Sequence, residues 1–367
     1  MSYPIRVLHI EIRGGIGGIE TFLSNLYSAI DKQKVQFDFI STASTLVLEK
    51  QFLYMGARVY KIPEPLHILK YYKTLYKIIS ENEYHIVHIH KNSAANIIPF
   101  IICKKLGVKT IIAHSHNTAP IKGKLSKILH RINQIYLLKV KTHSFACSQA
   151  AAEWLYGKEY TKNNEISIIK NGINIDKFKF NKKIREEIRK KLGINDSFVV
   201  GNVGRFMRQK NQSFLIEIFY ELLKERPNSV LILCGIGELE SELREKVNKL
   251  NINDKVMFLG LRKDVNEIMQ AMDIFVLPSL YEGLGIVAIE AQASGLPTIC
   301  SDEIPIEAKI LDTFRVISLK EDAKHWAKML IRVGELDRKM DSKNYIISAG
   351  YDISTIANNL EKFYLNN

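Results

Sequence analysis

The feature that most constrains this chain is an alternation of short apolar runs with helical segments, which occurs twice along its length. In the first half, the apolar runs predict strands at 5–12, 36–42, 57–62, 86–90, 109–117, 144–148 and 166–172. The pattern restarts at Ser197 and predicts strands at 198–205, 229–235, 256–260, 273–279, 296–301 and 315–319. Because strands that alternate with helices form parallel sheets covered on both faces, the sequence predicts two doubly wound α/β units.

The length of the chain supports this division into two domains. With 367 residues, the chain exceeds the roughly 250–300 residues at which single hydrophobic cores stop growing. We place an N-terminal domain at 1–175, a second domain at 176–345, and a C-terminal helix at 346–367 that packs back toward the first domain. The expected fold class is α/β, with two Rossmann-like domains whose parallel sheets face each other across a cleft. Ligands of such sheets bind at the carboxyl ends of the strands, so functional motifs should lie in the strand-to-helix loops.

The positive charge of the chain is confined to its N-terminal half. The formal net charge is +13, and residues 1–180 hold 25 Lys and Arg against 12 Asp and Glu. Residues 181–367 hold 27 of each kind and are neutral overall. Charge gathered in one domain predicts a polyanionic or membrane-surface partner for that domain.

Cysteine usage and targeting signals indicate the compartment. The cysteines lie far apart in apolar stretches, at Cys103, Cys147, Cys234 and Cys300. This spacing predicts buried reduced thiols, with neither a disulfide nor a metal site. No apolar stretch reaches the roughly 20 residues that span a bilayer. Because Arg6 and Glu11 come too early for a secretory signal peptide, we expect a cytoplasmic protein.

Two glycine-rich loops follow predicted strands. The first, at 13–20, contains four glycines and opens a helix, which is a context for phosphate binding at a helix N-terminus. Glu20 stands where the dinucleotide fingerprint requires glycine, so a nicotinamide or flavin site is disfavoured. The second loop, at 234–238, also departs from the fingerprint. For the first loop, the alternative is a tight turn without a ligand.

The most informative stretch is 278–291, which contains two glutamates eight residues apart. Glu282 precedes a predicted helix and Glu290 lies inside it, about 12 Å further along the helix axis. That separation suits one ligand that bridges both carboxylates, with a sugar at one end and a ribose at the other. It is too long for two carboxylates that share one scissile bond as in a retaining hydrolase. The alternative makes Glu282 a partner of the helix dipole and Glu290 a solvated residue.

Two cations lie on the loop after the strand at 198–205. Arg205 and Lys210 are five residues apart and could converge on a diphosphate, where arginine supplies a planar fork and lysine a point charge. The alternative is ordinary surface charge.

Together these motifs resemble those of the retaining nucleotide-sugar glycosyltransferases of family four, which have the GT-B fold. The matching pieces, in chain order, are the glycine loop at 14–20, Asn171–Gly172, the Arg205–Lys210 loop, the loop at 234–237, the E-x7-E of Glu282 and Glu290, and the segment 294–302. The resemblance covers nearly the whole chain. It is nearest to bacterial enzymes of capsule and exopolysaccharide assembly, which have an HSHN segment like that at 114–117.

The resemblance implies a role for each matching residue of the donor site. Glu282 approaches the hydroxyls of the donor sugar near the reacting carbon, and Glu290 holds the ribose. The diphosphate leaving group is bound by Arg205, Lys210, Gly17, Gly18 and the backbone N–H groups of Gly283, Leu284, Gly285 and Ile286. The ribose and base also lie near Gly235, Leu261 and Arg262.

Histidines form the second set of candidate residues. His116 corresponds by resemblance to the histidine at the reacting centre, and His114, two positions earlier, faces the same way. A structural histidine that is hydrogen-bonded in the wall of the site is the alternative for either residue. His88 and His90 also share one face, but no cysteine or carboxylate stands at ligand spacing, so we expect no zinc site. The absence of a DxD triad fits a metal-independent transferase without a cofactor, in which the nucleotide-sugar is a co-substrate.

Two basic amphipathic segments, at 64–80 and 121–141, lie in the N-terminal half. Each combines apolar residues at helical spacing with several lysines, as in helices that lie on anionic membranes. The ordinary alternative is that the apolar stripes face a core and the lysines face water. Because both segments lie in the domain expected to bind the acceptor, we favour a lipid-linked acceptor.

The resemblance, together with these observations, implies a retaining, metal-independent hexosyl- or N-acetylhexosaminyltransferase. It would move a sugar from a nucleotide-sugar, with UDP as the favoured nucleotide, to a lipid-linked or growing glycan in cell-surface polysaccharide synthesis. We expect it at the inner face of the cell membrane, bound peripherally to an anionic surface, with a glycan or polyprenyl-linked acceptor and no nucleic acid partner. The principal alternative is a soluble GT-B transferase that acts on a small-molecule or protein acceptor. A phosphorylase and a non-catalytic nucleic-acid or lipopolysaccharide binder are disfavoured.

Overall fold

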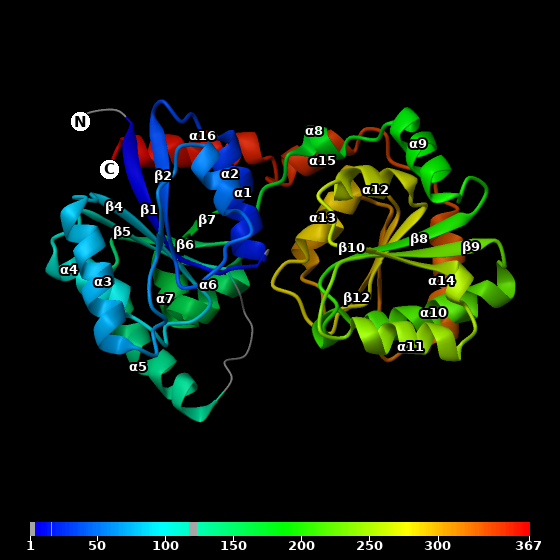
Figure 1. Ribbon diagram of the computed structural model, residues 1–367, viewed down its shortest axis with the longest axis horizontal. Coiled ribbons are helices and arrows are strands. Elements are labelled where there is room, and N and C mark those ends of the chain that lie inside the picture. Colours follow the sequence, from blue (N-terminus) through cyan, green and yellow to red (C-terminus); the bar gives the residue numbers. More distant parts are fainter. Residues whose placement is uncertain (1–3, 16, 117–122) are drawn as a thin grey trace. The chain divides into compact units, whose positions relative to one another are not determined.

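The computed structural model describes residues 4–15, 17–116 and 123–367, and the chain separates into two compact units (Figure 1). Unit 1 comprises residues 1–173 and 350–367, and unit 2 comprises residues 174–349. The boundaries expected from the sequence were 175 and 345. Asn117 of the HSHN segment and Lys122 of the basic segment lie outside the described residues.

Unit 1 is built on a parallel sheet with the strand order β3-β2-β1-β4-β5-β6-β7. Its strands are β1 (Ile5–Ile12), β2 (Val35–Ser41), β3 (Val59–Lys61), β4 (Ile86–Lys91), β5 (Thr110–Ser115), β6 (His143–Ala146) and β7 (Ser167–Ile168). The register places His9 of β1 opposite His88 of β4, and His90 of β4 opposite His114 of β5. One face of the central strands therefore carries a row of histidines.

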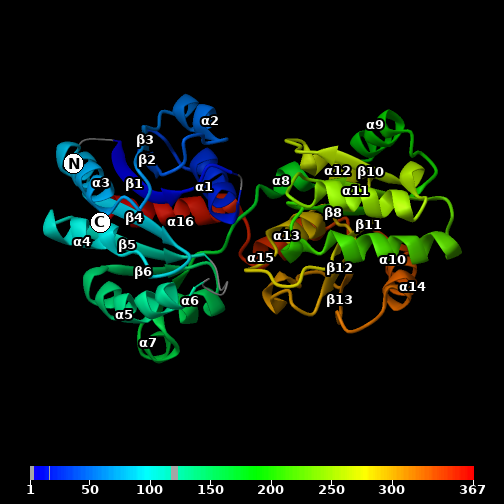
Figure 2. The same cartoon turned by 60° about the horizontal axis from the view of Figure 1, so that its bottom comes forward.

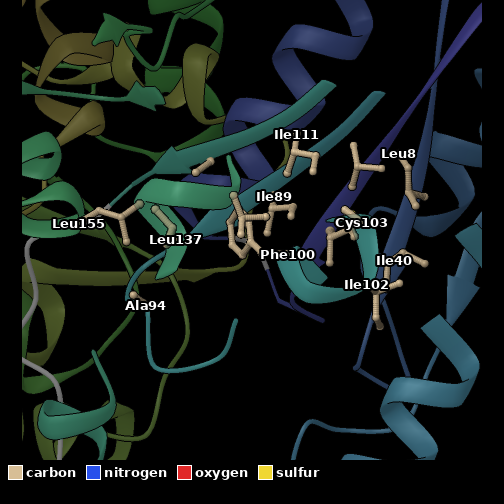
Figure 3. Close-up of a cluster of buried hydrophobic side chains, with 14 of the residues drawn as sticks. Leu8, Ile40, Ile89, Ala94, Phe100, Ile102, Cys103, Ile111, Leu137 and Leu155 are labelled. Carbon is tan, nitrogen blue, oxygen red and sulfur yellow. The ribbon is translucent and has the colours of Figure 1, made fainter. Parts of the chain in front are cut away.

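Helices cover both faces of this sheet. They are α1 (Gly18–Ala29), α2 (Glu49–Tyr54), α3 (Ile68–Glu81), α4 (Ile98–Lys105), α5 (Lys124–Val140), α6 (Gln149–Tyr156), α7 (Lys158–Asn163) and α16 (Ile353–Leu365). Buried side chains of α3, α4, α5 and α6 form one core with the strands, part of which is drawn in Figure 3. The opposite core is formed with α1, α2 and α16.

The C-terminal helix α16 is an integral part of unit 1, where it lies beside α1 (Figure 1). Asp352 caps its N-terminus by accepting a hydrogen bond of 2.9 Å from the backbone N–H of Thr355. Gly172 approaches the helix so closely that a Cβ there would lie 2.6 Å from Cδ1 of Ile356. The Asn171–Gly172 pair therefore serves at least to bring β7 and the following segment against α16.

Unit 2 repeats the architecture with a six-stranded parallel sheet in the order β10-β9-β8-β11-β12-β13. Its strands are β8 (Phe198–Val203), β9 (Ser229–Cys234), β10 (Val256–Gly260), β11 (Ile274–Leu277), β12 (Thr298–Ser301) and β13 (Phe314–Ile317). Its helices are α8 (Ile175–Phe178), α9 (Lys182–Leu192), α10 (Gln212–Glu225), α11 (Glu240–Lys249), α12 (Val265–Ala271), α13 (Ile286–Ala293), α14 (Ala323–Gly334) and α15 (Ser342–Ser348), with 3₁₀ turns η1 (Arg208–Lys210), η2 (Asn253–Lys255) and η3 (Ile306–Ala308). Helices α10 and α14 pack side by side over one core (Figure 2).

The two predicted doubly wound units are thus confirmed, and each apolar run predicted to be a strand overlaps an observed strand. The four cysteines are buried, as expected from their apolar surroundings. Among the described residues, no helix has the length and apolar character needed to cross a bilayer.

Candidate active site

The loops that follow four neighbouring strands of unit 2 gather at one edge of its sheet. Since the strands are parallel and ordered β10-β9-β8-β11, their carboxyl ends lie on the same edge. Backbone hydrogen bonds of 2.8–2.9 Å join these loops, from Gly235 to Gly260, from Gly204 to Cys234, and from Leu280 to Gln209. The predicted donor residues Leu261, Arg262, Gly235, Arg205, Lys210 and Glu282 all lie on these loops.

Lys210 and Glu282 form a largely buried ion pair. Nζ of Lys210 lies 2.5 Å from Oε1 of Glu282, and their side chains are only 16% and 8% exposed. The same Oε1 accepts a hydrogen bond of 2.8 Å from Oγ of Ser279. Gln209 donates from Nε2 to the backbone carbonyl of Tyr281 over 3.0 Å. The carboxylate of Glu282 is therefore held in one position by a cation and a hydroxyl.

The loop that carries Lys210 has a defined conformation. Asn211, directly after η1, adopts a left-handed conformation with φ of 54° and donates from Nδ2 to the carbonyl of Pro278 over 3.1 Å. The Lys210 stem lies against Gly204, where a Cβ would stand 3.3 Å from Cε of Lys210. These contacts tie the loop after β8 to the loop after β11 and direct the Lys210 ammonium to Glu282.

Glu290 is a partly buried carboxylate whose hydrogen-bonding capacity is unused. It lies on α13 between Ile289 and Ala291, which are fully buried. Within the described ranges, its side chain takes part in no hydrogen bond or ion pair. Burial raises the pKa of Glu290 to about 7, against the opposing effect of the positive charge on Lys210. Such a carboxylate is suited to accept hydrogen bonds from the hydroxyls of a ligand.

The first turn of α13 offers free backbone donors next to these glutamates. Gly285 caps the helix in a left-handed conformation with φ of 77°. The N–H groups of Gly283, Leu284, Gly285 and Ile286 donate to no acceptor among the residues that the structure describes. Unpaired N–H groups at a helix N-terminus form a site for an anion, so this turn can hold a phosphate.

The two predicted arginines of unit 2 each have a carboxylate neighbour. Arg205 lies 3.2 Å from Glu238, and both side chains are exposed. Arg262 forms two hydrogen bonds with Asp264, of 2.8 and 2.5 Å. Their roles at a diphosphate and a base remain predictions.

The glycines of the loop at 234–238 allow its backbone to pack closely against the backbone of the loop after β8. A Cβ on Gly235 would lie 2.0 Å from the carbonyl oxygen of Gly204, and a Cβ on Gly237 would lie 2.2 Å from that of Phe206. The glycines therefore allow the loop after β9 to lie directly on the loop that carries Arg205 and Lys210.

In unit 1, the first glycine loop is closed by Glu20. The Glu20 carboxylate accepts hydrogen bonds from the backbone N–H groups of Arg13 and Gly17, of 2.8 and 3.1 Å. The N–H of Gly18 has no acceptor among the described residues, and a Cβ added there would meet no atom within 4 Å. Of the two predicted phosphate contacts in this loop, Gly18 is the one whose N–H is not already engaged.

Five buried histidines occupy one face of the unit 1 sheet. His9, His90 and His116 form a series in which Nδ1 of His9 lies 3.0 Å from Nε2 of His90, and Nδ1 of His90 lies 2.8 Å from Nε2 of His116. A second series joins the Tyr364 hydroxyl to Nδ1 of His88 over 2.8 Å, and Nε2 of His88 to Nδ1 of His114 over 3.0 Å. The pKa of His116 is lowered to about 3 by burial. Burial also lowers the pKa of the other four, so all five rings are neutral at pH 7.

These histidines are the candidate metal ligands of the described chain. Two triplets have ring nitrogens within 4.8 Å of one another, namely His9, His88 and His90, and His90, His114 and His116. Neighbouring rings lie at interplanar angles of 15° to 44°, so their planes are closer to parallel than to perpendicular. Both nitrogens of His90 already bond to other histidines. The arrangement favours hydrogen bonding between the rings over tetrahedral coordination.

A further ion pair at the carboxyl edge of the unit 1 sheet was not anticipated from the sequence. Lys91, at the end of β4 and only 2% exposed, donates from Nζ to the Glu11 carboxylate and, over 2.7 Å, to the carbonyl of Asn96. Glu11 has a φ of 75° at an irregularity of β1. The signal that could have revealed the pair is a charged residue, of opposite sign in each, near the carboxyl end of each of two strands.

Comparison with protein families and known proteins gives consistent matches over the chain. The family described as "Glycosyl transferases group 1" matches residues 184–352, and "Glycosyltransferase Family 4" matches residues 16–177. The putative glycosyltransferase EpsF of Bacillus subtilis is 32% identical over 360 residues, which cover 95% of this chain and 93% of that protein. An Escherichia coli UDP-Gal:alpha-D-GlcNAc-diphosphoundecaprenol alpha-1,3-galactosyltransferase is 28% identical, over 81% of this chain and 79% of that protein.

Solved structures with the same architecture are also found. HepE of Anabaena in complex with UDP-glucose aligns with a TM-score of 0.81 and 20% identity, covering 99% of this chain and 100% of that one. WaaG, a glycosyltransferase involved in lipopolysaccharide biosynthesis, aligns with a TM-score of 0.71 and 17% identity, covering 98% and 99% of the two chains. At these identities the likeness demonstrates the fold, which is GT-B.

Proposed function

The chain belongs to the group 1 glycosyltransferases, and from this premise we propose that it transfers a hexosyl or N-acetylhexosaminyl residue from a UDP-sugar to a growing or lipid-linked glycan in bacterial cell-surface polysaccharide synthesis. The observation that carries the proposal is the group of residues at the edge of the unit 2 sheet. The group comprises the Lys210–Glu282 ion pair, the N–H groups of 283–286 and the Glu290 carboxylate. Neither these N–H groups nor this carboxylate has a partner in the described part of the chain.

The diphosphate of the donor would lie at the N-terminus of α13. Its negative charge would be stabilised by the free N–H groups at 283–286 and by Lys210, with Arg205 as a further contact. Because Lys210 is already paired with Glu282, its ammonium is fixed in place before a ligand arrives, which reduces the reorganisation needed as charge develops on the leaving group.

Glu290 would bind the ribose and Glu282 the donor sugar. The carboxylate of Glu290 has both oxygens available for the two ribose hydroxyls, and the helix places it beyond Glu282 along the axis. The base would lie near Gly235, Leu261 and Arg262. A uracil base is supported by the UDP-glucose complex of HepE and by the UDP-galactose donor in the name of the Escherichia coli relative.

We propose retention of the anomeric configuration by front-face attack within a short-lived ion pair. In that mechanism the main requirement is stabilisation of the departing diphosphate, which fixed N–H dipoles and a lysine can supply in place of a metal ion. No cofactor enters this scheme. His116 would act at the reacting centre.

Exposed apolar and basic side chains on α5 support binding to an anionic membrane surface. The helix buries only His130, Leu137 and Val140, whereas an apolar stripe is 37–70% exposed and consists of Leu125, Ile128, Leu129, Ile132, Ile135 and Tyr136. Lys124, Lys127 and Arg131 lie on the same helix. Unit 1 as a whole holds 24 Lys and Arg against 13 Asp and Glu. An apolar stripe that is exposed among the described residues, with basic neighbours, suits a lipid headgroup region and thus a lipid-linked acceptor.

The alternative acceptor is a small molecule or a protein in solution. It would require no membrane, and it predicts activity that is independent of vesicles.

A panel of UDP-, GDP- and ADP-sugars tests the donor assignment. We expect one or more UDP-sugars to raise the melting temperature of the wild-type protein and to be turned over to free UDP, with both effects lost in Glu290→Ala. A failure of every nucleotide to raise the melting temperature would refute the donor site.

A further inference from the structure

In the series His9–His90–His116 of unit 1, the positions of the ring protons depend on one another. His90 uses both of its ring nitrogens within the series, Nε2 toward His9 and Nδ1 toward His116. A neutral imidazole has one N–H and one lone pair, so His90 must donate in one of these bonds and accept in the other. The protons of all three rings are therefore ordered in one direction, and only two orders exist.

In the first order, His116 carries its proton on Nε2, His90 on Nε2, and His9 on Nε2. In the second order, all three protons sit on Nδ1. The two free ends of the series are Nδ1 of His116 and Nε2 of His9, and both are buried without a hydrogen-bond partner among the described residues. One end must therefore present an N–H and the other a lone pair.

The surroundings of His9 favour the first order. Its ring packs against Phe37 at a centroid distance of 4.2 Å and against Phe39 at 5.7 Å. The negative face of an aromatic ring attracts an N–H and repels a lone pair. At the other end, Phe22 lies further away, at 5.6 Å from the His116 ring. The closer aromatic ring at His9 favours the N–H at that end of the series, which leaves the lone pair at Nδ1 of His116.

We propose that His90 and His9 are positioning residues that hold His116 as the Nε2-protonated tautomer, so that its Nδ1, at the free end of the series, carries a lone pair and no proton. This rests on the proposed function, in which His116 acts at the reacting centre. The series fixes the His116 ring in orientation as well, because rotation about its side chain would break the 2.8 Å bond to His90. The backbone of His116 is fixed separately, since its N–H donates to the carbonyl of Lys91 over 3.1 Å.

The neighbouring series provides a matched control. His88 lies two residues from His90 on β4, is equally buried, and stacks on the His90 ring, but it bonds to Tyr364 and His114 and not to His116. Replacing either residue by phenylalanine removes one buried imidazole from the same sheet face. Only His90→Phe removes the acceptor for Nε2–H of His116. In His90→Asn, the side-chain amide oxygen lies near the former Nδ1 and can still accept that bond.

The test is nitrogen-15 NMR of the histidine rings in the full-length protein, together with transfer kinetics. We expect wild-type His116 to show a protonated Nε2 and a bare Nδ1. In His90→Phe, the His116 signals should become those of mixed tautomers, and kcat should fall by about tenfold or more while the donor KM is unchanged. His88→Phe should leave the His116 signals as in wild type, and His90→Asn should restore both the signals and most of kcat.

Three results would overturn the inference. They are a proton on Nδ1 of wild-type His116, equal effects of His90→Phe and His88→Phe on its signals, or a stoichiometric metal ion bound through these rings in the purified protein. The spectra are recorded without a nucleotide-sugar, so they determine the proton order whether or not the protein is active. A wild-type protein without transferase activity would refute the proposed function alone.

Discussion

Nζ of Lys210 lies 2.5 Å from Oε1 of Glu282, although the two residues are 72 positions apart in the chain. The pair exists because β8 and β11 are neighbours in the unit 2 sheet and the loops at their carboxyl ends meet. It joins a residue expected at the diphosphate to one expected at the donor sugar. The two candidate roles are thus mechanically linked, and a change at either residue affects both.

The first prediction separates the structural role of this pair from its role in transfer. Lys210→Met leaves a buried carboxylate without its cation and should lower the free energy of unfolding by about 3 kcal/mol. Adding Glu282→Gln to that variant should restore most of the stability, because no unpaired charge is left. Sugar transfer should be lost in Lys210→Met, in Glu282→Gln and in the double variant. Urea unfolding and UDP release measure the two properties, and a double variant that regains activity would contradict the assigned roles.

A second prediction concerns the ionisation of Glu290. Burial raises its pKa to about 7, so its ionised form, the better acceptor for ribose hydroxyls, becomes populated between about pH 6 and pH 8. Nucleotide affinity should therefore rise with pH over this range. Calorimetric titration of UDP at several pH values measures it, and Glu290→Gln should bind more weakly and should retain only the pH dependence that comes from the terminal phosphate of UDP. Equal pH profiles in wild type and in Glu290→Gln would contradict the ribose assignment.

The same residue should reduce stability above neutral pH. Because the folded-state pKa of Glu290 is raised above its unfolded value, the folded state disfavours the ionised carboxylate, and this cost is complete above pH 7 and absent below about pH 4.5. Glu290→Gln should therefore raise the free energy of unfolding at pH 8 by about 1–3 kcal/mol and have little effect at pH 4.5. An unchanged or lower stability at pH 8 would show that the carboxylate is not desolvated.

The buried histidines predict loss of stability in acid. Their folded-state pKa values are lowered by burial, that of His116 to about 3, so the unfolded chain binds more protons below pH 6.5. The stabilising contribution of the neutral histidines is fully present above pH 6.5. Below that value, each histidine should lower the free energy of unfolding by about 1.4 kcal/mol per pH unit. Urea unfolding between pH 7.5 and pH 5 measures the slope. His88→Asn should reduce the slope by the share of one histidine, and an equal slope in this variant would contradict a buried neutral His88.

Vesicle binding should depend on α5. Neutralising Lys122, Lys124 and Lys127 should weaken binding to anionic vesicles by about 3 kcal/mol, or roughly a hundredfold, because each basic residue near such a surface contributes about 1 kcal/mol. Ile128→Ser with Ile132→Ser should weaken it further by removing apolar contacts. The matched control neutralises Lys182, Lys183 and Lys190 of α9 in unit 2, where the first two are 83% and 85% exposed. Sedimentation with vesicles gives the affinities, and the affinity for UDP should be unchanged in all these variants. If the two sets of lysine substitutions weaken vesicle binding equally, α5 is an ordinary solvated surface and not a membrane contact.

The fold could be predicted because the alternation of apolar runs and helical segments restarts at Ser197 and each strand-to-helix loop could be located. Alternation also placed His88 with His90, and His114 with His116, on common faces. The Lys210–Glu282 pair, the Lys91–Glu11 pair and the His9–His90–His116 series could not be predicted, because each joins different strands and depends on the order of strands in a sheet. The exposure of the α5 stripe was likewise open, since helical spacing shows that a stripe exists and not whether a core covers it.

The central claim is that the loops at the carboxyl edge of the unit 2 sheet form a nucleotide diphosphate site. Calorimetric titration of UDP into the full-length protein at pH 8 tests it most directly. We predict one site per chain, an affinity at least about tenfold weaker in Glu290→Ala and in Lys210→Met, and an unchanged affinity in His90→Phe. The absence of binding heat for UDP, GDP and ADP alike, or equal affinities in wild type, Glu290→Ala and Lys210→Met, would contradict the claim.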